Sequence, residues 1–450
     1  MLLHRKALLH LRRHPRRFGL TSIDRDPPAG ADYQRFGQEV DAVLVRDDVS
    51  VWFPRAVDTV RGGFTAHHSN SWRPLPMQSK SLVFQARMTW FAAQVSERMT
   101  EAWAARFQGY ARLGLTFLRD VLWDSERGGF FWNLTTQREL PPGDAGAKHA
   151  YGMAFGIYAC ANVARVLGDA GALDLAQRSF RWLDDHAHDS RHGGYHEDFD
   201  RDGAPASRDS VKMALSVVGA PLGFKSANTH IHLLEAFTEL YRVWSDDLLR
   251  DRLIELFVIV RDKMFVLPGC LNQFYTADYR PVPALDSYGH DVEAAYLFIE
   301  AARALGSQDD ARSWETARLL VDNALDHAFD PIGGGFFDEG PAFRHATGFT
   351  KTWWSQAEAL NALMFMHERF GADDLRYWTA LTQTWKFIRR RQIDSRHGGW
   401  HHTIGADNKP IAGPKGHNWK DPYHSGRALL NVSKLLRRLG NEKLPPLSIP

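Results

Sequence analysis

A short motif of two glycines and an aromatic residue recurs along the chain and constrains its fold more than any other feature. The motif is Gly-Gly-Phe at 62–64, 128–130 and 334–336, Gly-Gly-Tyr at 193–195 and Gly-Gly-Trp at 398–400. Its copies lie about 65 residues apart, and the gap between the copies at 193 and 334 spans two such periods. The segment Leu271–Tyr275 lies where the missing copy is expected. The sequence therefore indicates six repeated units.

Each unit repeats one order of predicted elements. A first helix, such as Asp174–Ala187 or Leu375–Arg391, leads into the motif, and it is charged on one side, as in 246–261. After a short extended segment comes a second helix, apolar almost all round, as in 154–161 and 357–366; a helix of that kind is buried. The second helices are predicted to begin near Lys80, His149, Ser226, His290, Thr352 and Tyr423.

These elements predict an all-α fold, an (α/α)6 barrel of six inner and six outer helices with short strands and loops at one end. An open stacked solenoid is the alternative architecture. Residues 31–442 are predicted to form this single catalytic domain, and residues 443–450 a C-terminal tail. Residues 1–30 are basic and end in Pro-Pro-Ala-Gly, without the apolar core and cleavage site of a secretory signal, so a flexible tail is expected there.

Charge and cysteine content exclude several classes of partner. A net charge of +2 gives no general attraction for nucleic acid or membranes. Two cysteines, Cys160 and Cys270, cannot build a disulfide framework, which favours a reducing, cytoplasmic compartment. No apolar run reaches transmembrane length. A monomer or homodimer that binds a small molecule is expected.

Cofactor motifs are lacking in the sequence. No glycine-rich loop follows a predicted strand, so no nucleotide cofactor is expected. His188, His192 and His196 are spaced by four, but they run into the Gly193-Gly194 turn and lack the helical His-Glu-His pattern of zinc hydrolases. We expect neither a cofactor nor a metal, with a zinc site as the competing interpretation.

The segment Tyr288–Glu293 is the strongest candidate for chemistry. His290 and Glu293 are three residues apart, so on a helix they share one face. A histidine beside a carboxylate at the start of a buried helix can carry a proton-transfer step. The structural alternative is an ordinary helix start with a solvated acidic turn.

The other inner helices carry polar or aromatic residues at matching places. Singly, Asn228 can cap a helix, His232 can be a core histidine, and only Glu358 is hard to explain, because an unpaired buried carboxylate is costly. Together they indicate one polar site, since the inner helices all begin at the same end of a barrel. The residues are Arg87, Asn228, His232, Trp354, Glu358, Trp419 and His424.

Four motifs make residues 35–440 resemble the N-acylglucosamine 2-epimerase family, and within it the cellobiose 2-epimerase branch. They are Asn228–Ala236, Gly289–Glu293, Trp353–Ala359 and Trp419–Arg427. The resemblance implies an (α/α)6 barrel that epimerises C2 of a reducing-end aldose, or interconverts aldose and ketose, without a cofactor. It implies His290 and His424 as the catalytic histidines. It assigns sugar-contacting or histidine-supporting roles to Arg87, Asn228, His232, Glu293, Trp354, Glu358 and Trp419.

The chain departs from the family pattern in two regions that bear on the choice of sugar. The loop Asp202–Phe224 is particular to this sequence, and the segment Phe336–Thr350 offers no tryptophan before Trp353. Both put a preference for disaccharides in doubt, but not the chemistry at C2. Two other functions stay open: a glycoside hydrolase or lyase using Asp291 or Asp421 with Glu358, and a non-catalytic sugar- or protein-binding module.

Overall fold

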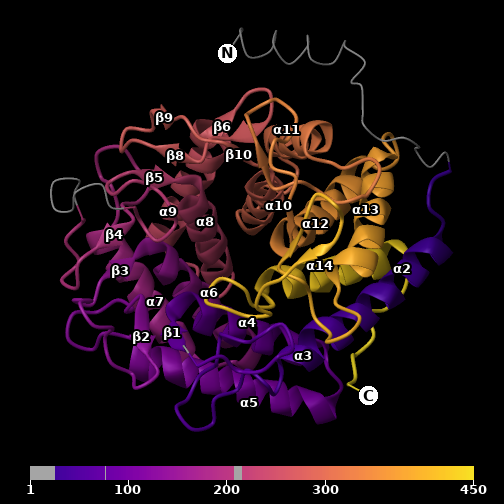
Figure 1. Ribbon diagram of the computed structural model, residues 1–450. Helices are drawn as coiled ribbons and strands as arrows, with labels where there is room; N and C mark the ends of the chain where they lie inside the picture. The colour runs from indigo at the N-terminus through magenta and orange to yellow at the C-terminus, as the bar shows by residue number, and fades with distance from the viewer. Residues whose placement is uncertain (1–25, 77, 207–214, 450) are drawn as a thin grey trace.

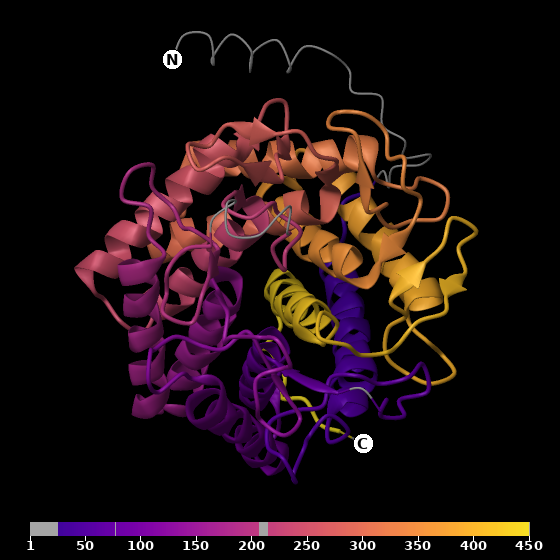
Figure 2. The ribbon, with the colours of Figure 1, turned by 60° about the vertical axis from the view of Figure 1, so that its left-hand side comes forward.

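The computed structural model describes residues 26–76, 78–206 and 215–449. The predicted N-terminal tail therefore lies mostly outside the described residues, as does the middle of the 202–224 loop. Figures 1 and 2 show helices arranged around a common centre, with loops and very short strands gathered at one end. Within the described part of the chain, no helix is both long and apolar enough to cross a membrane.

Six buried helices surround the centre, and their starts lie close to the predicted ones. Each is in contact with the next along the chain, and α14 contacts α4. Almost every residue of α6 is buried, as its all-round apolar sequence predicts. The inner helices are α4 (Leu82–Arg98), α6 (Ala150–Leu167), α8 (Ala227–Tyr241), α10 (Tyr288–Ala304), α12 (Trp353–Phe370) and α14 (Tyr423–Leu439).

The outer helices bury one face and expose the other. In α7, for instance, Leu175, Phe180 and Leu183 are buried while the charged residues between them face outward. Four of the outer segments contain a short π-helical stretch. The outer segments are α2 (Gly30–Val43) with η1 (Leu44–Val49) and α3 (Ser50–Trp52), α5 (Glu101–Phe117) with η2 (Leu118–Leu122), α7 (Ala170–His186), α9 (Asp247–Val258) with η3 (Ile259–Met264), α11 (Ala311–His327), and α13 (Arg376–Phe387) with η4 (Ile388–Gln392).

The strands are two or three residues long and pair in small antiparallel sheets. Several of them lead directly into an inner helix, as β5 leads into α8. They are β1 (Ser79–Ser81), β2 (Asn133–Thr135), β3 (Lys148–His149), β4 (Asp198–Phe199), β5 (Lys225–Ser226), β6 (Phe265–Val266), β7 (Cys270–Leu271), β8 (Phe274–Tyr275), β9 (Pro281–Val282), β10 (Asp286–Ser287), β11 (Glu339–Gly340), β12 (Lys351–Thr352), β13 (Thr403–Ile404) and β14 (Pro410–Ile411). Every inner helix except α14 begins directly after one of these strands.

The Gly-Gly-aromatic motif makes the turn between an outer helix and the following strand. Both glycines of each copy have positive φ, a conformation that favours glycine. A Cβ on Gly63 would lie 2.4 Å from Oε1 of Gln85, so the turn also presses against the inner helix. The backbone N–H of the aromatic residue Phe64 donates to the same Gln85 oxygen at 2.7 Å. Leu271 N–H donates in the same way to Asp291 at 2.7 Å. The segment Leu271–Tyr275 therefore takes the place of the missing copy of the motif, as the sequence predicted.

A buried lysine ties the turn to the segment that leads into the next inner helix in five of the six units that the structure describes. Lys225 Nζ, for example, lies 2.8 Å from Oδ2 of Asp189 and donates to the carbonyl of Gly193 at 2.6 Å. The aspartate lies six residues before the aromatic residue of the motif, a spacing that sequence reasoning overlooked. The five pairs are Lys80–Asp58, Lys148–Asp124, Lys225–Asp189, Lys351–Asp330 and Lys415–Asp394.

Removing the carboxylate from one such pair is expected to be costly. Asp189→Ala leaves Lys225 buried without its carboxylate, and it should lower the free energy of unfolding by about 3–5 kcal/mol in a denaturant titration. The double variant Asp189→Ala/Lys225→Met removes both charges and should be much less destabilised. A double variant as unstable as the single one would show that the ion pair is not what holds the turn.

Candidate active site

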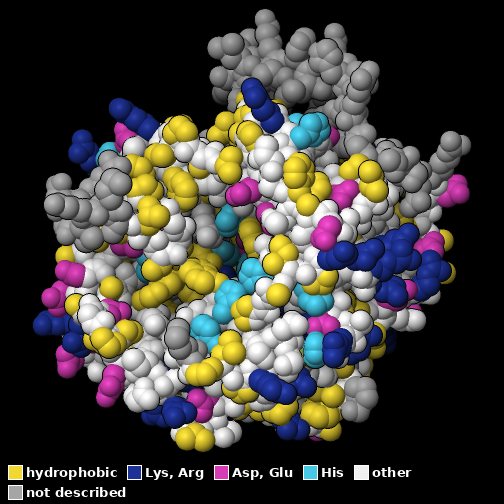
Figure 3. All heavy atoms as spheres, viewed as in Figure 1, with side chains coloured by type: hydrophobic (Ala, Val, Ile, Leu, Met, Phe, Trp, Pro, Cys, Tyr) yellow, Lys and Arg dark blue, Asp and Glu magenta, His cyan; other side chains and the backbone are white. Residues whose placement is uncertain are grey.

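The inner helices present two layers of side chains near their N-terminal ends. The upper layer is formed by the second or third residue of a helix: Tyr151, Asn228, His290, Trp354 and His424. The lower layer lies one turn deeper: Arg87, Phe155, His232, Glu293, Glu358 and Arg427. Residues three or four apart share a helix face, so matched positions in the repeat become neighbours in space. Figure 3 shows a hollow at the centre of this end, with histidine side chains along it.

Arg427 joins three buried carboxylates in the lower layer. Its Nη2 donates to Oε1 of Glu293 at 2.5 Å and to Oε1 of Glu358 at 2.8 Å, and its Nη1 donates to Glu235. One guanidinium cannot neutralise three carboxylates. Burial and the neighbouring Glu358 accordingly raise the pKa of Glu293 to about 8. Burial also raises the pKa of Glu235, but Arg427 outweighs it and brings that pKa down to about 2. Glu293 is therefore a protonated carboxyl at neutral pH.

His424 rests on this network. Its Nδ1 lies 2.5 Å from Oε1 of Glu358, whose Oε2 accepts the hydroxyl of Tyr296 at 2.5 Å. A proton held on Nδ1 leaves Nε2 as the free acceptor of the ring. Burial, followed by the guanidinium groups of Arg87 and Arg427, lowers the pKa of His424 well below its usual range. His424 is thus a neutral imidazole, the form that a general base requires.

His290 faces the same indole ring as His424. The ring of Trp354 lies 4.9 Å from that of His290 and 5.7 Å from that of His424, centre to centre. Burial lowers the pKa of His290 to about 3. Its Nδ1 has no hydrogen-bond partner among the residues that the structure describes. The two predicted catalytic histidines, from α10 and α14, therefore border one aromatic side chain.

His232 and Asn228 extend the site along α8. Nδ1 of His232 lies 3.0 Å from Oε2 of Glu235, and its Nε2 lies 3.9 Å from Oε1 of Glu293. His232 is therefore connected to the Arg427 network from a second side. Asn228 is half-buried one turn above, and its Oδ1 has no partner in the described part of the chain.

Arg87 and Trp419 lie on the side of α4 and α6. Arg87 is buried, donates to the hydroxyl of Tyr151 at 2.9 Å, and stacks its guanidinium over the Phe155 ring at 4.2 Å. The ring centre of Trp419 lies 5.7 Å from that of Tyr151, and 37% of this tryptophan is exposed. Arg87 is thus a cation fixed by aromatic rings, and Trp419 lies toward the surface.

Several members of this arrangement were missed by sequence reasoning. Glu235 lies three residues after His232, and Arg427 three after His424, so the helix spacing that identified Glu293 also applied to them. Tyr151 stands at the matching position of α6. Tyr296 likewise lies three residues after Glu293, but its contact with Glu358 links α10 to α12 and is set by helix packing.

The two acids proposed for a hydrolase have other partners. Asp421 lies 3.7 Å from Arg87 through its Oδ2. Asp291 faces away from the two layers, toward the backbone of Leu271 and Asn323 of α11.

Glu293, Glu358 and His424 bring ligand atoms within 4.8 Å of one another, the geometry of a possible metal site. The guanidinium of Arg427 donates to both carboxylates, so a cation already lies between them. His188 and His192 are bound elsewhere, to Glu255 at 3.0 Å and to Asp189 at 3.2 Å. The donor set fits a guanidinium rather than a metal ion.

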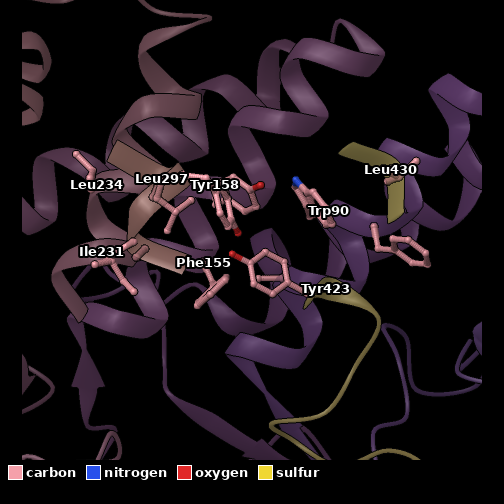
Figure 4. Packing of buried hydrophobic residues seen from close by; sticks show 14 of the residues in the cluster. Trp90, Phe155, Tyr158, Ile231, Leu234, Leu297, Tyr423 and Leu430 are labelled. Atoms are coloured by element: carbon pink, nitrogen blue, oxygen red, sulfur yellow. The ribbon is translucent and has the colours of Figure 1, made fainter. Parts of the chain in front are cut away.

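A cavity of about 580 Å³ lies at the opposite ends of the inner helices. Figure 4 shows Trp90, Tyr158, Leu297 and Leu430, which line it, around this deep part of the core. Its lining also reaches the far side of the network, at Glu235, Tyr296 and Arg427. The basic residues there complement the negative ends of the helix dipoles. None of the side chains predicted from the sequence as catalytic or sugar-contacting lines this cavity.

The fold of paired helices agrees with the comparisons with known proteins. The chain belongs to the N-acylglucosamine 2-epimerase family, whose sequence profile matches residues 62–428. It is an enzyme of the isomerase class.

Individual relatives agree with this assignment. The chain is 30% identical over 397 residues to the cellobiose 2-epimerase of Bacteroides fragilis, covering 88% of this chain and 98% of the relative. It is 25% identical to a D-mannose isomerase of Thermobifida fusca, covering 84% and 89%. Among solved structures it is similar to the cellobiose 2-epimerase from Bacillus thermoamylovorans, with a TM-score of 0.80, 25% identity, and 89% and 99% of the two chains covered.

Replacing Arg427 should destabilise the protein in a pH-dependent way. Arg427→Met removes the cation shared by Glu235, Glu293 and Glu358 and should cost about 3–5 kcal/mol of unfolding free energy at about pH 8. Losing the cation raises the pKa of these carboxylates in the folded protein, so stability is retained at low pH and lost as the pH rises. The deficit should therefore shrink at about pH 5, as denaturant unfolding at the two pH values would show.

Arg35→Met is the matched control for that experiment. Arg35 is 71% exposed and pairs with Asp32 at 2.8 Å on the surface. An exposed ion pair contributes roughly 0–1 kcal/mol, so this variant should lose little at either pH. Equal losses in the two arginine variants would contradict the central role of Arg427.

Proposed function

We propose that this chain is a sugar 2-epimerase that inverts C2 of a reducing-end aldose, with cellobiose-type disaccharides as the first candidate substrates. The observation that carries the proposal is the pair His290 and His424, which approach one indole from two helices. A sugar between them would be flanked by a base and an acid. The proposal includes a closed (α/α)6 barrel, supported by the contact of α14 with α4.

In the proposed reaction, Nε2 of His424 removes the proton from C2 of the open-chain glucose unit. The hydrogen bond of its Nδ1 to Glu358 stabilises the imidazolium that results. Negative charge then develops on O1 of the enediolate. Arg87 and the protonated Glu293 are the donors that we expect to stabilise it.

His290 returns a proton to the opposite face of C2, which inverts the centre. The negative enediolate beside His290 favours its protonated form, against the burial that lowers its pKa. From the mannose side the two histidines exchange roles. A binding module would need no base on either side of the sugar, so this arrangement favours catalysis.

Trp419 supports a disaccharide as substrate. Its partly exposed ring lies 6.0 Å from that of Trp132, and the two tryptophans form an aromatic surface beside Tyr151. A second sugar ring could stack on such a surface. The D-mannose isomerase relative supports a second candidate, a 2-epimerase or aldose–ketose isomerase acting on free mannose or glucose. Incubation with cellobiose, lactose, glucose and mannose, followed by NMR, distinguishes the two.

Replacement of either histidine should remove most turnover. His290→Asn and His424→Asn should each lower kcat by about 10²–10⁴-fold, the usual contribution of one acid–base group, while sugar binding changes much less. In D₂O the epimer should carry deuterium at C2, because histidine protons exchange with solvent. Wild-type kcat in either variant would exclude the pair, and a product without deuterium at C2 would count against the two-base reaction.

Activity should not depend on a metal ion. Since Arg427 occupies the place between the carboxylates, dialysis against a chelator should leave kcat unchanged, as assayed by NMR with the substrate that proves active. Loss of activity on chelation, with recovery on adding a divalent metal, would overturn this interpretation of the Glu293, Glu358 and His424 group.

A further inference from the structure

The fourth unit, which carries His290, lacks the lysine–aspartate pair found in the other five. Phe265 stands where the other units have aspartate, six residues before the motif position Leu271. Asp286 stands two residues before the inner helix, where Lys80, Lys148, Lys225 and Lys351 stand in their units. This one unit therefore replaces a buried cation by a carboxyl group.

A second exception lies on α10 itself. The fourth residue of an inner helix receives the backbone N–H of the motif's aromatic residue in four other units, through the side chains of Gln85, Met153, His230 and Gln356. In the fourth unit that acceptor is Asp291, which binds Leu271 N–H at 2.7 Å. The two exceptions place two carboxyl groups side by side.

Asp286 and Asp291 are both buried, and their carboxyl groups interact with each other. Nδ2 of Asn323, from α11, lies 3.3 Å from Oδ2 of Asp286 and 3.4 Å from Oδ2 of Asp291. Neither carboxyl forms an ion pair with a lysine or arginine in the described part of the chain. The titratable groups that face them are Cys270 on β7, Tyr275 on β8 and Tyr288 on α10, and burial raises the pKa of all three, so they stay neutral.

We propose that Asp286 and Asp291 share one proton, and that this carboxyl–carboxylate pair is the positioning element that holds His290 in place. Two adjacent buried carboxylates cannot both be ionised without a cation, so a proton between them takes the place of the missing lysine. Asp291 follows His290 directly in the first turn of α10. The inference rests on the proposed role of His290 in proton transfer.

The first turn of α10 packs tightly against the side chain of Trp354. A Cβ added to Gly289 would lie 2.4 Å from the ring of Trp354, so this turn packs directly on the indole that both histidines border. If the shared proton is lost, repulsion between the carboxylates pushes Asp291 away from Asp286, and His290 moves with it. The protonation of the Asp286–Asp291 pair thereby controls the position of His290.

The direction of the pH effect follows from the burial of the pair. Burial raises the pKa of Asp286 to about 7, and burial together with the charge of Asp286 raises that of Asp291 well above its usual range. The folded protein therefore holds more protons here than the unfolded chain. Such a pair stabilises the fold at low pH, and its contribution is lost as the pH rises through about 7 and above.

Asp286→Asn tests the proposal, because an asparagine amide donates permanently where the shared proton did. The melting temperature of the wild type should fall from about pH 6 to about pH 9, whereas that of the variant should fall less. The ratio of kcat at about pH 9 to kcat at about pH 7 should be higher in the variant, by about threefold or more, with KM little changed. Parallel pH profiles of both quantities in the two proteins would overturn the proposal.

Two further variants keep the test decisive. Asp291→Asn can make the same donation from the other side and should show the same flattened profile if Asp286→Asn fails to fold. Asp189→Asn/Lys225→Met, in the third unit, removes an ionised carboxylate, whose pKa Lys225 holds far below this range, together with that lysine, so no buried charge is left unpaired. It should lower the melting temperature by the same amount across the pH range. If this double variant flattened the profile as well, the effect would be a general one of weakened turns, and the proposal would fail.

The melting experiment needs no substrate, so it separates the two proposals. If no sugar is epimerised but the melting profiles differ as expected, the proposed function fails and the shared proton stands. If epimerisation depends on His290 but the profiles run parallel, the proposed function stands and the positioning pair fails.

Discussion

The need to neutralise buried carboxylates governs the centre of this protein. Glu235, Glu293 and Glu358 come from three helices and meet a single cation, Arg427, supplied by the last inner helix. Leaving any of these charges unpaired in the interior would cost several kcal/mol, so the helices must pack in one register around the guanidinium. The same network sets the protonation of its neighbours. It gives His424 a fixed tautomer and leaves Glu293 as a hydrogen-bond donor.

Most of the repeated units share one structural device, and the unit that carries His290 departs from it. Five units close their turns with a buried lysine and aspartate, which need only local spacing to form. The unit that differs is the one that carries His290. There two carboxyl groups replace the ion pair, and the surroundings become sensitive to pH. The contact that closes the turn in the other units is replaced here by a pair that we propose to position His290.

The positions of the candidate site were predictable because they follow helix spacing. His290 and Glu293, Asn228 and His232, and Trp354 and Glu358 each share a helix face, and a common start for the inner helices brings the faces together. The contact of Tyr296 with Glu358 and the pairing of Asp286 with Asp291 were not predictable in this way. Their partners lie on other helices or other turns, and the contacts depend on how neighbouring elements are rotated against one another.

The sequence by itself determined the number of units, the order of inner and outer helices, and the residues that begin each inner helix. These features follow from periodic glycines and apolar residues, which act over one or two helical turns. Only the tertiary structure decided which charges meet. Arg427 could have paired with any nearby carboxylate, and Asp291 could have faced the hollow or the outer helix. Their partners are set by the packing of segments far apart in the chain, because a buried charge takes whatever partner the completed fold places within reach.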